Sequence, residues 1–178
     1  MDLAELQKQL VSQQGKLPPV DKWDPKFCGD IDLEIKHDGS WHYMGTPIGR
    51  QALVKLFASV IKREGDDYFL VTPVEKVGIR VVDSPFIITQ WQQQDEQLIF
   101  TTKTEDVFVV STDNPVELKI DIATGETLPY ALVRANLWAR LHQNVFYQLT
   151  ELGREQQKDG CQQLIVQSGN YNFSLGKL

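Results

Sequence analysis

The most constraining feature of this sequence is an apolar stripe with helical spacing in residues 48–61. The stripe consists of Ile48, Ala52, Leu53, Leu56, Phe57, Val60 and Ile61. Thr46 and Pro47 precede it and favour a helix start, because a threonine hydroxyl caps first-turn amides and proline lacks an amide that would stay unpaired there. A Lys-Arg pair and Gly65 follow, as is typical of a helix end. The spacing therefore predicts one helix whose apolar face is buried.

Segments with β character flank that helix. Residues 31–36 alternate apolar and polar side chains, and Asp38-Gly39 predicts a turn into a second strand at residues 41–44. Strands are also expected at residues 68–71 and 77–82. Residues 1–16 carry leucines at helical spacing and predict a short amphipathic helix. Together these elements predict a first α+β domain over residues 1–78.

Residues 79–178 predict a second domain made of a β-meander and one helix. A helix is expected from Thr127 to Leu152, where Gly153 ends an apolar stripe. A terminal hairpin is expected at residues 162–167 and 171–175. The meander strands are predicted at residues 86–91, 98–101, 107–110 and 116–121. We expect an antiparallel sheet or half-barrel in this domain, and the α+β class for the whole chain.

The two halves also suggest an internal duplication. A shift of 84 residues places Ile48 on Leu132, and it places Arg50 on Arg134. Each of the two predicted helices then follows a strand with a Glu-apolar-Lys pattern. Two interpretations stay open, a true structural repeat and a chance alignment, because any two amphipathic helices align at their apolar stripes. The matched arginines favour a duplicated motif.

Composition excludes some classes of protein and disfavours others. The formal net charge of −6 and the pI near 5.0 argue against binding to nucleic acid, which needs a basic face. No apolar run approaches the roughly 18 residues of a membrane-spanning helix. The N-terminal residues also lack the apolar core of a secretory signal. We therefore expect a cytoplasmic protein that binds neither membrane nor nucleic acid.

Motifs for catalysis or metal binding are missing from the sequence. It contains no glycine-rich phosphate loop and no nucleophile elbow. Cys28 and Cys161 stand far apart and are read as two free thiols. His37, His42 and His142 do not have the spacing of metal ligands. We therefore predict no catalytic residue, metal or cofactor, although a triad assembled from distant residues would escape this reading.

Binding is better supported than catalysis. Trp41 and Tyr43 share one face of their strand, and Arg50 lies at the start of the following predicted helix, whose free amides favour an anion. If the ends of these elements converge, they suit a phosphate-bearing ligand with a flat base. The alternative is purely structural packing and ion pairing. The candidate ligand-binding residues are Trp41, Tyr43, Arg50, Thr72, Glu75, Lys76 and Arg134.

Several of these residues belong to a pattern that resembles a bacterial family, domain of unknown function family 1285. The resemblance runs from about Trp23 to Leu152. It rests on residues 38–41 (DGSW), Tyr43, residues 45–48 (GTPI), Arg50, residues 53–54 and 56–57, residues 70–77 (LVTPVEKV), residues 82–83 and 85–86, residues 129–130 and 133–134, Leu137 and residues 139–140. The DGSW and TPVEKV blocks are distinctive together.

The resemblance implies two α+β domains built by duplication, the second loosely similar to a pleckstrin-homology fold. It also implies a site for a nucleotide-like molecule at the domain interface and a role in signalling. The leading hypothesis is thus a non-enzymatic module that binds an anionic small molecule. One rival is a protein-interaction adaptor using exposed sheet edges and the glutamine-rich turn at residues 92–94. The other is an enzyme acting on a phosphorylated metabolite.

Overall fold

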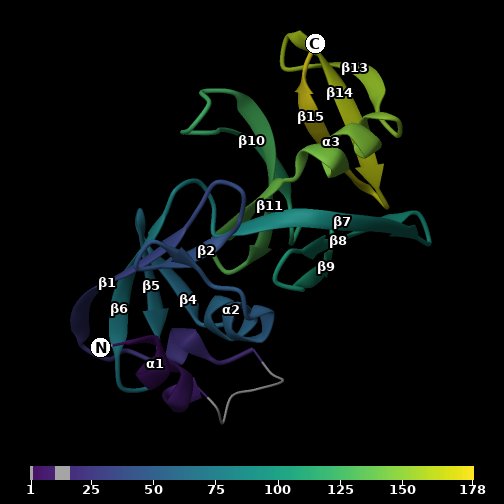
Figure 1. The fold of residues 1–178 in the computed structure, drawn as a ribbon. Helices are drawn as coiled ribbons and strands as arrows, with labels where there is room; N and C mark the ends of the chain where they lie inside the picture. Colours follow the sequence, from purple (N-terminus) through teal and green to yellow (C-terminus); the bar gives the residue numbers. More distant parts are fainter. Residues whose placement is uncertain (1, 11–16) are drawn as a thin grey trace. The chain divides into compact units, whose positions relative to one another are not determined.

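The computed structural model describes residues 2–10 and 17–178 of the chain. They fall into two units, Met1–Val82 and Asp83–Leu178. Within these described residues the strands form two six-stranded sheets, sheet A in the first unit and sheet B in the second, and a three-stranded sheet C in the second unit (Figure 1). Sheet B is a curled half-barrel, so the predicted α+β class with two β-rich units is confirmed. The structural division follows Val82, whereas the sequence interpretation ends the first domain at residue 78.

The first unit is a mixed sheet with helices. Its elements are α1 (Leu3–Leu10), the 3₁₀ turn η2 (Val20–Lys22), β1 (Phe27–Ile35), β2 (Trp41–Tyr43), β3 (Thr46–Pro47), α2 (Gln51–Ala58), β4 (Ile61–Glu64), β5 (Asp67–Val71) and β6 (Lys76–Val81). Sheet A has the order β3-β2-β1-β6-β5-β4. β1 and β6 run parallel, and the other neighbours are antiparallel. The parallel pair joins two meanders, β1–β3 and β4–β6, which α2 connects in sequence.

Alternation along the strands selects the face of sheet A that forms the core. Leu33 and Ile35 of β1 are fully buried, and so is Leu70 of β5. Phe57 of α2 and Leu10 of α1 are also fully buried, and the two helices contact each other. The helix predicted within residues 1–16 is confirmed over Leu3–Leu10. Residues 1 and 11–16 lie outside the described residues.

The helix α2 of the first unit is shorter than the sequence predicts. It spans Gln51–Ala58, after Arg50 in an extended conformation. The predicted helix start at Thr46 and Pro47 is wrong, because these residues form β3 and pair with β2. The predicted helix end is also wrong, because Ile61 begins β4 and pairs with Leu70 of β5. Pairing with strands that lie outside the local sequence window overrides the helical spacing at both ends.

The second unit contains the predicted meander strands, the further strands β11 and β12, one helix and the three-stranded sheet C. Its elements are β7 (Phe86–Gln94), β8 (Gln97–Thr102), β9 (Val107–Val109), β10 (Val116–Ile120), β11 (Thr127–Arg134), β12 (Leu137–Leu141), α3 (Gln143–Thr150), β13 (Arg154–Lys158), β14 (Cys161–Ser168) and β15 (Tyr171–Lys177). The terminal hairpin is confirmed as β14 and β15. The sequence interpretation missed β13, a fully polar strand that completes sheet C.

The helix predicted from Thr127 to Leu152 is wrong over most of its length. Residues 127–141 form the β11–β12 hairpin, with Ala135 at the turn in a left-handed conformation (φ 49°). The buried residues Ala131 and Ala139 face each other across this hairpin. Only α3 is helical, and the Nδ1 atom of His142 accepts a hydrogen bond from the Asn144 amide to cap it.

The two sheets share one topology. Read from its other end, sheet B has the order β9-β8-β7-β12-β11-β10, which matches sheet A when each strand number is raised by six. The parallel pair β1–β6 corresponds to β7–β12. The proposed shift of 84 residues is wrong, because it lays α2 over residues 135–142, mostly β12. The matching first strands are offset by 86 − 27 = 59 residues. A helix follows the third strand in the first unit and the sixth strand in the second.

None of the helices in the described residues is long and apolar enough to span a bilayer.

Candidate ligand-binding site

A pocket of about 330 Å³ opens on sheet A of the first unit, over β1, β5 and β6. Its lining residues are Phe27, Asp30, Asp67, Tyr68, Phe69, Lys76, Gly78 and Ile79. Three strands meet here because β1 pairs with β6 in parallel and β6 pairs with β5 in antiparallel fashion. Residues up to about 50 positions apart in the sequence thereby line the same pocket.

Gly78 forms the floor of this pocket at the centre of three strands. It pairs with Asp30 of β1 on one side and with Phe69 of β5 on the other. The Asp30 carboxylate lies over Gly78, in the space where a Cβ atom would sit. Glycine inside a strand commonly marks such a close approach. The missing side chain at position 78 therefore fixes where the Asp30 carboxylate sits.

Aromatic rings and a lysine form one wall. The rings of Phe27 and Phe69 meet edge to face, with centroids 5.8 Å apart. The Lys76 ammonium lies 4.4 Å from the centre of the Phe69 ring, a cation–π contact. The same ammonium is 2.5 Å from Oε2 of Glu64. The positive charge of Lys76 is therefore already matched by a carboxylate and a ring face.

Two carboxylates give the pocket its charge. Asp30 and Asp67 are exposed lining residues, and among the described residues their side chains have no hydrogen-bond or ion-pair partner. Lys76 is the one cation among the eight lining residues. Because Glu64 neutralises Lys76, the charge that remains among the lining residues is the negative charge of the two aspartates. Carboxylates beside aromatic faces complement a ligand that carries an amine or guanidinium group.

Three of the candidate residues from the sequence lie at the β5–β6 connection. The Thr72 hydroxyl accepts hydrogen bonds from the amides of Val74 and Glu75, at 3.2 and 3.0 Å. It also donates to Oε1 of Gln9, whose amide nitrogen donates to Glu75 Oε2 at 2.8 Å. Thr72 and Glu75 thus hold α1 against the sheet, and only Lys76 of this group lines the pocket.

The other candidates lie elsewhere. Trp41 is 2% exposed and belongs to the core, while Tyr43 lies further along β2. Arg50 is exposed at the start of α2. Arg134 belongs to the second unit, where its Nε contacts Asp106 at 3.3 Å and its guanidinium lies over the Phe86 ring. None of these four is among the lining residues of the pocket.

Sequence reasoning missed four residues that shape this pocket, namely Phe27, Phe69 and the two aspartates. Asp67 lies in a turn-like Asp-Asp pair, which ordinarily indicates a solvated position. One available signal was Gly78 inside a predicted strand, since such a glycine marks close approach of another group. That signal identifies the floor but not the strand that supplies Asp30.

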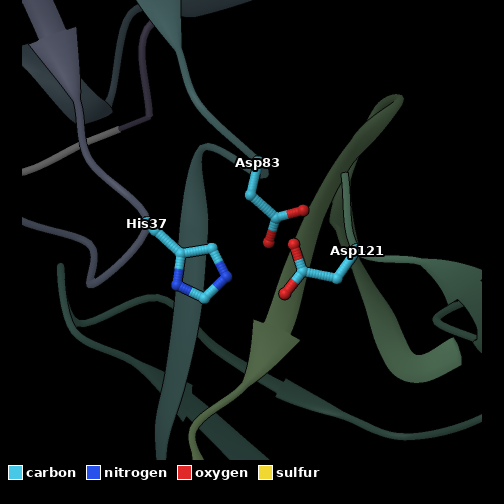
Figure 2. Close-up of side chains that lie close together, drawn as sticks. All are labelled: His37, Asp83 and Asp121. Atoms are coloured by element: carbon cyan, nitrogen blue, oxygen red, sulfur yellow. The ribbon is translucent and has the colours of Figure 1, made fainter. Parts of the chain in front are cut away.

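The second unit holds a polar cluster of another kind. Asp83 Oδ2 accepts from Arg140 Nε at 3.1 Å, and Asp83 Oδ1 accepts from the Tyr130 hydroxyl at 2.7 Å. The carboxylates of Asp83 and Asp121 lie within 4.8 Å of each other (Figure 2). His37, also drawn there, belongs to the first unit.

Burial and charge explain the proton affinity of Tyr130 in this cluster. Loss of solvent raises the pKa of the Tyr130 hydroxyl, and its hydrogen bond to the Asp83 carboxylate raises this pKa further. The negative charge of Asp121 acts in the same direction. Both carboxylate oxygens of Asp83 already have protein partners, so we read the cluster as structural.

Fold and pocket together define a class of protein: two α+β units built on one repeated strand order, with an acidic, aromatic pocket on the first sheet. The family described as "Domain of unknown function (DUF1285), N-terminal domain" matches residues 18–84. "Protein of unknown function (DUF1285), C-terminal domain" matches residues 85–175. The chain belongs to the DUF1285 family, as its sequence motifs indicated.

Solved structures agree with this assignment. A DUF1285 family protein from Silicibacter pomeroyi DSS-3 is 41% identical, with a TM-score of 0.87, over 99% of this chain and 96% of that chain. A DUF1285 family protein from Shewanella baltica OS155 is 28% identical, with a TM-score of 0.55, over 67% of this chain and 90% of that chain. The comparison with curated proteins gave no match.

Proposed function

We propose that this protein is a binding module for a small cationic ligand, with its site in the sheet A pocket of the first unit. The observation that carries the proposal is the pair of unpartnered carboxylates, Asp30 and Asp67, among the described residues lining a pocket with aromatic walls. Ligand pockets are commonly concave and aromatic, with a few polar groups that set orientation. Here those polar groups are acidic.

The volume limits the size of the ligand. A cavity of about 330 Å³ lies at the lower end of the range for small-molecule sites, roughly 300–1,000 Å³. An aliphatic amine or a guanidine of a few carbons fits this space. The cation would contact Asp30 and Asp67, and its hydrocarbon part would lie along Phe27 and Phe69. Lys76, held by Glu64, would limit how close a second ligand cation could approach.

The anionic, nucleotide-like ligand expected from the sequence is the competing hypothesis. It draws on Arg50 and Lys76, but only Lys76 lines this pocket, and its charge is matched by Glu64. The pocket therefore favours a cation over an anion. Signalling, a protein partner and a cytoplasmic location remain predictions from the sequence and the resemblance.

A thermal-shift panel tests the proposal. The cationic probes are agmatine, spermidine and arginine, and the anionic probes are ATP and inorganic phosphate. At 100 times its dissociation constant, one ligand adds about 2.7 kcal/mol, which raises the Tm by several degrees. We expect a shift with at least one cationic probe that disappears in Asp30→Asn. A shift with ATP alone that disappears in Arg50→Ala would support the anionic hypothesis and contradict the proposal.

A further inference from the structure

Arg80 is a second cation of β6 beside the pocket. It lies two residues beyond Gly78 and on the same face of sheet A, because side chains alternate along a strand. The ladder of β5 and β6 pairs Tyr68 with Ile79, and the next positions in that register are Asp67 and Arg80. Residues directly opposite each other have Cβ atoms about 5 Å apart. The Arg80 guanidinium is therefore within reach of the Asp67 carboxylate.

The hydrogen bonds of the Arg80 guanidinium nevertheless go to β1. Its Nη2 atom donates to Oδ1 of Asp32 at 2.6 Å, and its Nε atom donates to Oε2 of Glu34 at 3.2 Å. These two bonds raise the pKa of Arg80. Across β5, Asp67 has no ion-pair partner among the described residues. The carboxylate of the pocket and the arginine opposite it thus remain apart.

An irregularity in the β1–β6 ladder supplies one of the two carboxylates that bind Arg80. The register pairs Asp30 with Gly78 and then pairs Glu34 with Arg80. Over this stretch β1 advances 34 − 30 = 4 residues while β6 advances 80 − 78 = 2. Such irregularities often lie next to functional sites, where they redirect a side chain. Here the extra length of β1 brings Asp32 to the same arginine as Glu34.

We propose that Asp32 and Glu34 are positioning residues that hold Arg80 on the β1 side of β6 and so keep the Asp67 carboxylate available to a ligand. This inference rests on the cation site proposed for the sheet A pocket. A guanidinium released from β1 pairs with Asp67 and competes with the ligand cation for the same oxygens. The two β1 carboxylates therefore affect the ligand through Arg80 and do not contact it.

Exposure allows this competition. The Arg80 side chain is 55% exposed, so it rotates toward β5 through solvent and not through the core. Exposed ion pairs are individually weak, and the position of Arg80 therefore depends on how many acceptors lie on each side. Glu64 lies opposite Asp67 on β4, but it is already bound to Lys76. Without the two β1 acceptors, Asp67 is the acceptor directly across from Arg80.

A thermodynamic cycle in agmatine affinity tests the role of Arg80. The double substitution Asp32→Asn with Glu34→Gln is made in the wild-type chain and in Arg80→Gln, and each full-length variant is titrated by calorimetry. Loss of two negative charges weakens cation binding in both backgrounds. Release of the arginine adds to this loss only where Arg80 is present. We expect the loss in affinity to be about fivefold larger there, the size of an exposed ion pair. Equal losses in the two backgrounds contradict the proposal.

Lys36→Gln is the matched control. The Lys36 ammonium lies 2.6 Å from Oε1 of Glu34, so this variant removes another partner of the same carboxylate and leaves the bonds to Arg80 in place. Agmatine affinity should stay within about twofold of the wild-type value. Far-UV circular dichroism establishes that each variant is folded. If the double substitution unfolds the chain, Asp32→Asn alone completes the cycle, with an expected difference of about twofold.

NMR of the Arg80 Nε–H group tests the same geometry without a ligand. In the wild-type chain Asp67→Asn should leave this signal unchanged, because the guanidinium is bound to β1. In the chain with Asp32→Asn and Glu34→Gln, Asp67→Asn should shift the signal, because Arg80 then pairs with Asp67. A shift already in the wild-type chain, or in neither chain, contradicts the positioning role. Absence of agmatine binding contradicts the proposed function instead, and the NMR result then tests the positioning role by itself.

Discussion

The carboxylate of Asp30 occupies the space over Gly78 that any larger residue at position 78 would need. This contact joins β1 to β6, two strands that are neighbours only through parallel pairing. The size of the residue at position 78 therefore determines where the Asp30 carboxylate lies in the pocket. Changes at Gly78 and at Asp30 should therefore have related effects on ligand binding.

Gly78→Ala should weaken binding of a cationic ligand without unfolding the protein. The new methyl group displaces the exposed Asp30 carboxylate, while the strand backbone at position 78 accepts alanine without strain. We expect a change in the free energy of unfolding within about 1 kcal/mol, measured by urea denaturation. Gly176→Ala is the matched control, because nothing lies within 4 Å of a Cβ at that strand glycine. Equal agmatine affinity in both variants would argue against a role for Asp30.

Trp41→Phe should cost little stability although the side chain is buried. Among the described residues, the Trp41 Nε1 group is buried without a hydrogen-bond partner. Phenylalanine removes this donor, and an unsatisfied buried donor costs about 1–3 kcal/mol. That gain offsets lost packing, so we expect a net destabilisation of about 1 kcal/mol or less, against 3–5 kcal/mol for Trp41→Ala. Ligand affinity should not change in Trp41→Phe, and a large loss would return Trp41 to the binding site.

Thr72→Val should destabilise the first unit through the β5–β6 turn. The variant keeps the side-chain volume but leaves the amides of Val74 and Glu75 without their acceptor. Removing such partners inside a fold costs about 1–3 kcal/mol. Thr72→Ser retains the hydroxyl and is the control, with a smaller loss expected. If Thr72→Val unfolds at the same urea concentration as Thr72→Ser, the hydroxyl contributes nothing and the turn is held by other contacts.

The raised pKa of Tyr130 predicts how the free energy of unfolding depends on alkaline pH. The pKa of its hydroxyl is raised in the folded protein above the ordinary value of 10.0. Above pH 10 the unfolded chain therefore releases this proton while the folded protein retains it. The stabilisation is complete below that pH and is lost as the pH rises, by about 1.4 kcal/mol per pH unit. Urea denaturation from pH 9 to pH 11 should show a shallower decline in Tyr130→Phe. Identical slopes would contradict the assignment.

The sequence predicted the elements whose patterns are local. The alternation in residues 116–121 appears as β10, and the strands of the meander lie where their turn residues place them. The hairpin at residues 127–141 was mistaken for a helix, because apolar residues 132, 133, 137 and 141 also fit a helical stripe. Its turn is Ala135-Asn136, and the left-handed position falls on Ala135 and not on a glycine or asparagine, so the usual hairpin signal is missing.

The candidate site was harder to predict because it depends on strand order. Lys76 was identified from its neighbours in sequence, whereas Asp30 reaches the pocket only because β1 pairs with β6. Parallel pairing between strands so far apart leaves no local pattern. The shared topology of the two sheets was likewise hidden, since the helices occupy different places in the two units.

The most direct test of the central claim is calorimetric titration of the full chain with agmatine. Wild type would be compared with Asp67→Asn and with Asp66→Asn, which remove the same charge at adjacent positions. Asp67 lines the pocket, whereas the Asp66 side chain is fully exposed outside it. The proposal predicts binding to wild type and to Asp66→Asn, with affinity reduced roughly tenfold in Asp67→Asn. Absence of binding to wild type, or equal affinity in the two variants, would contradict a cation site in this pocket.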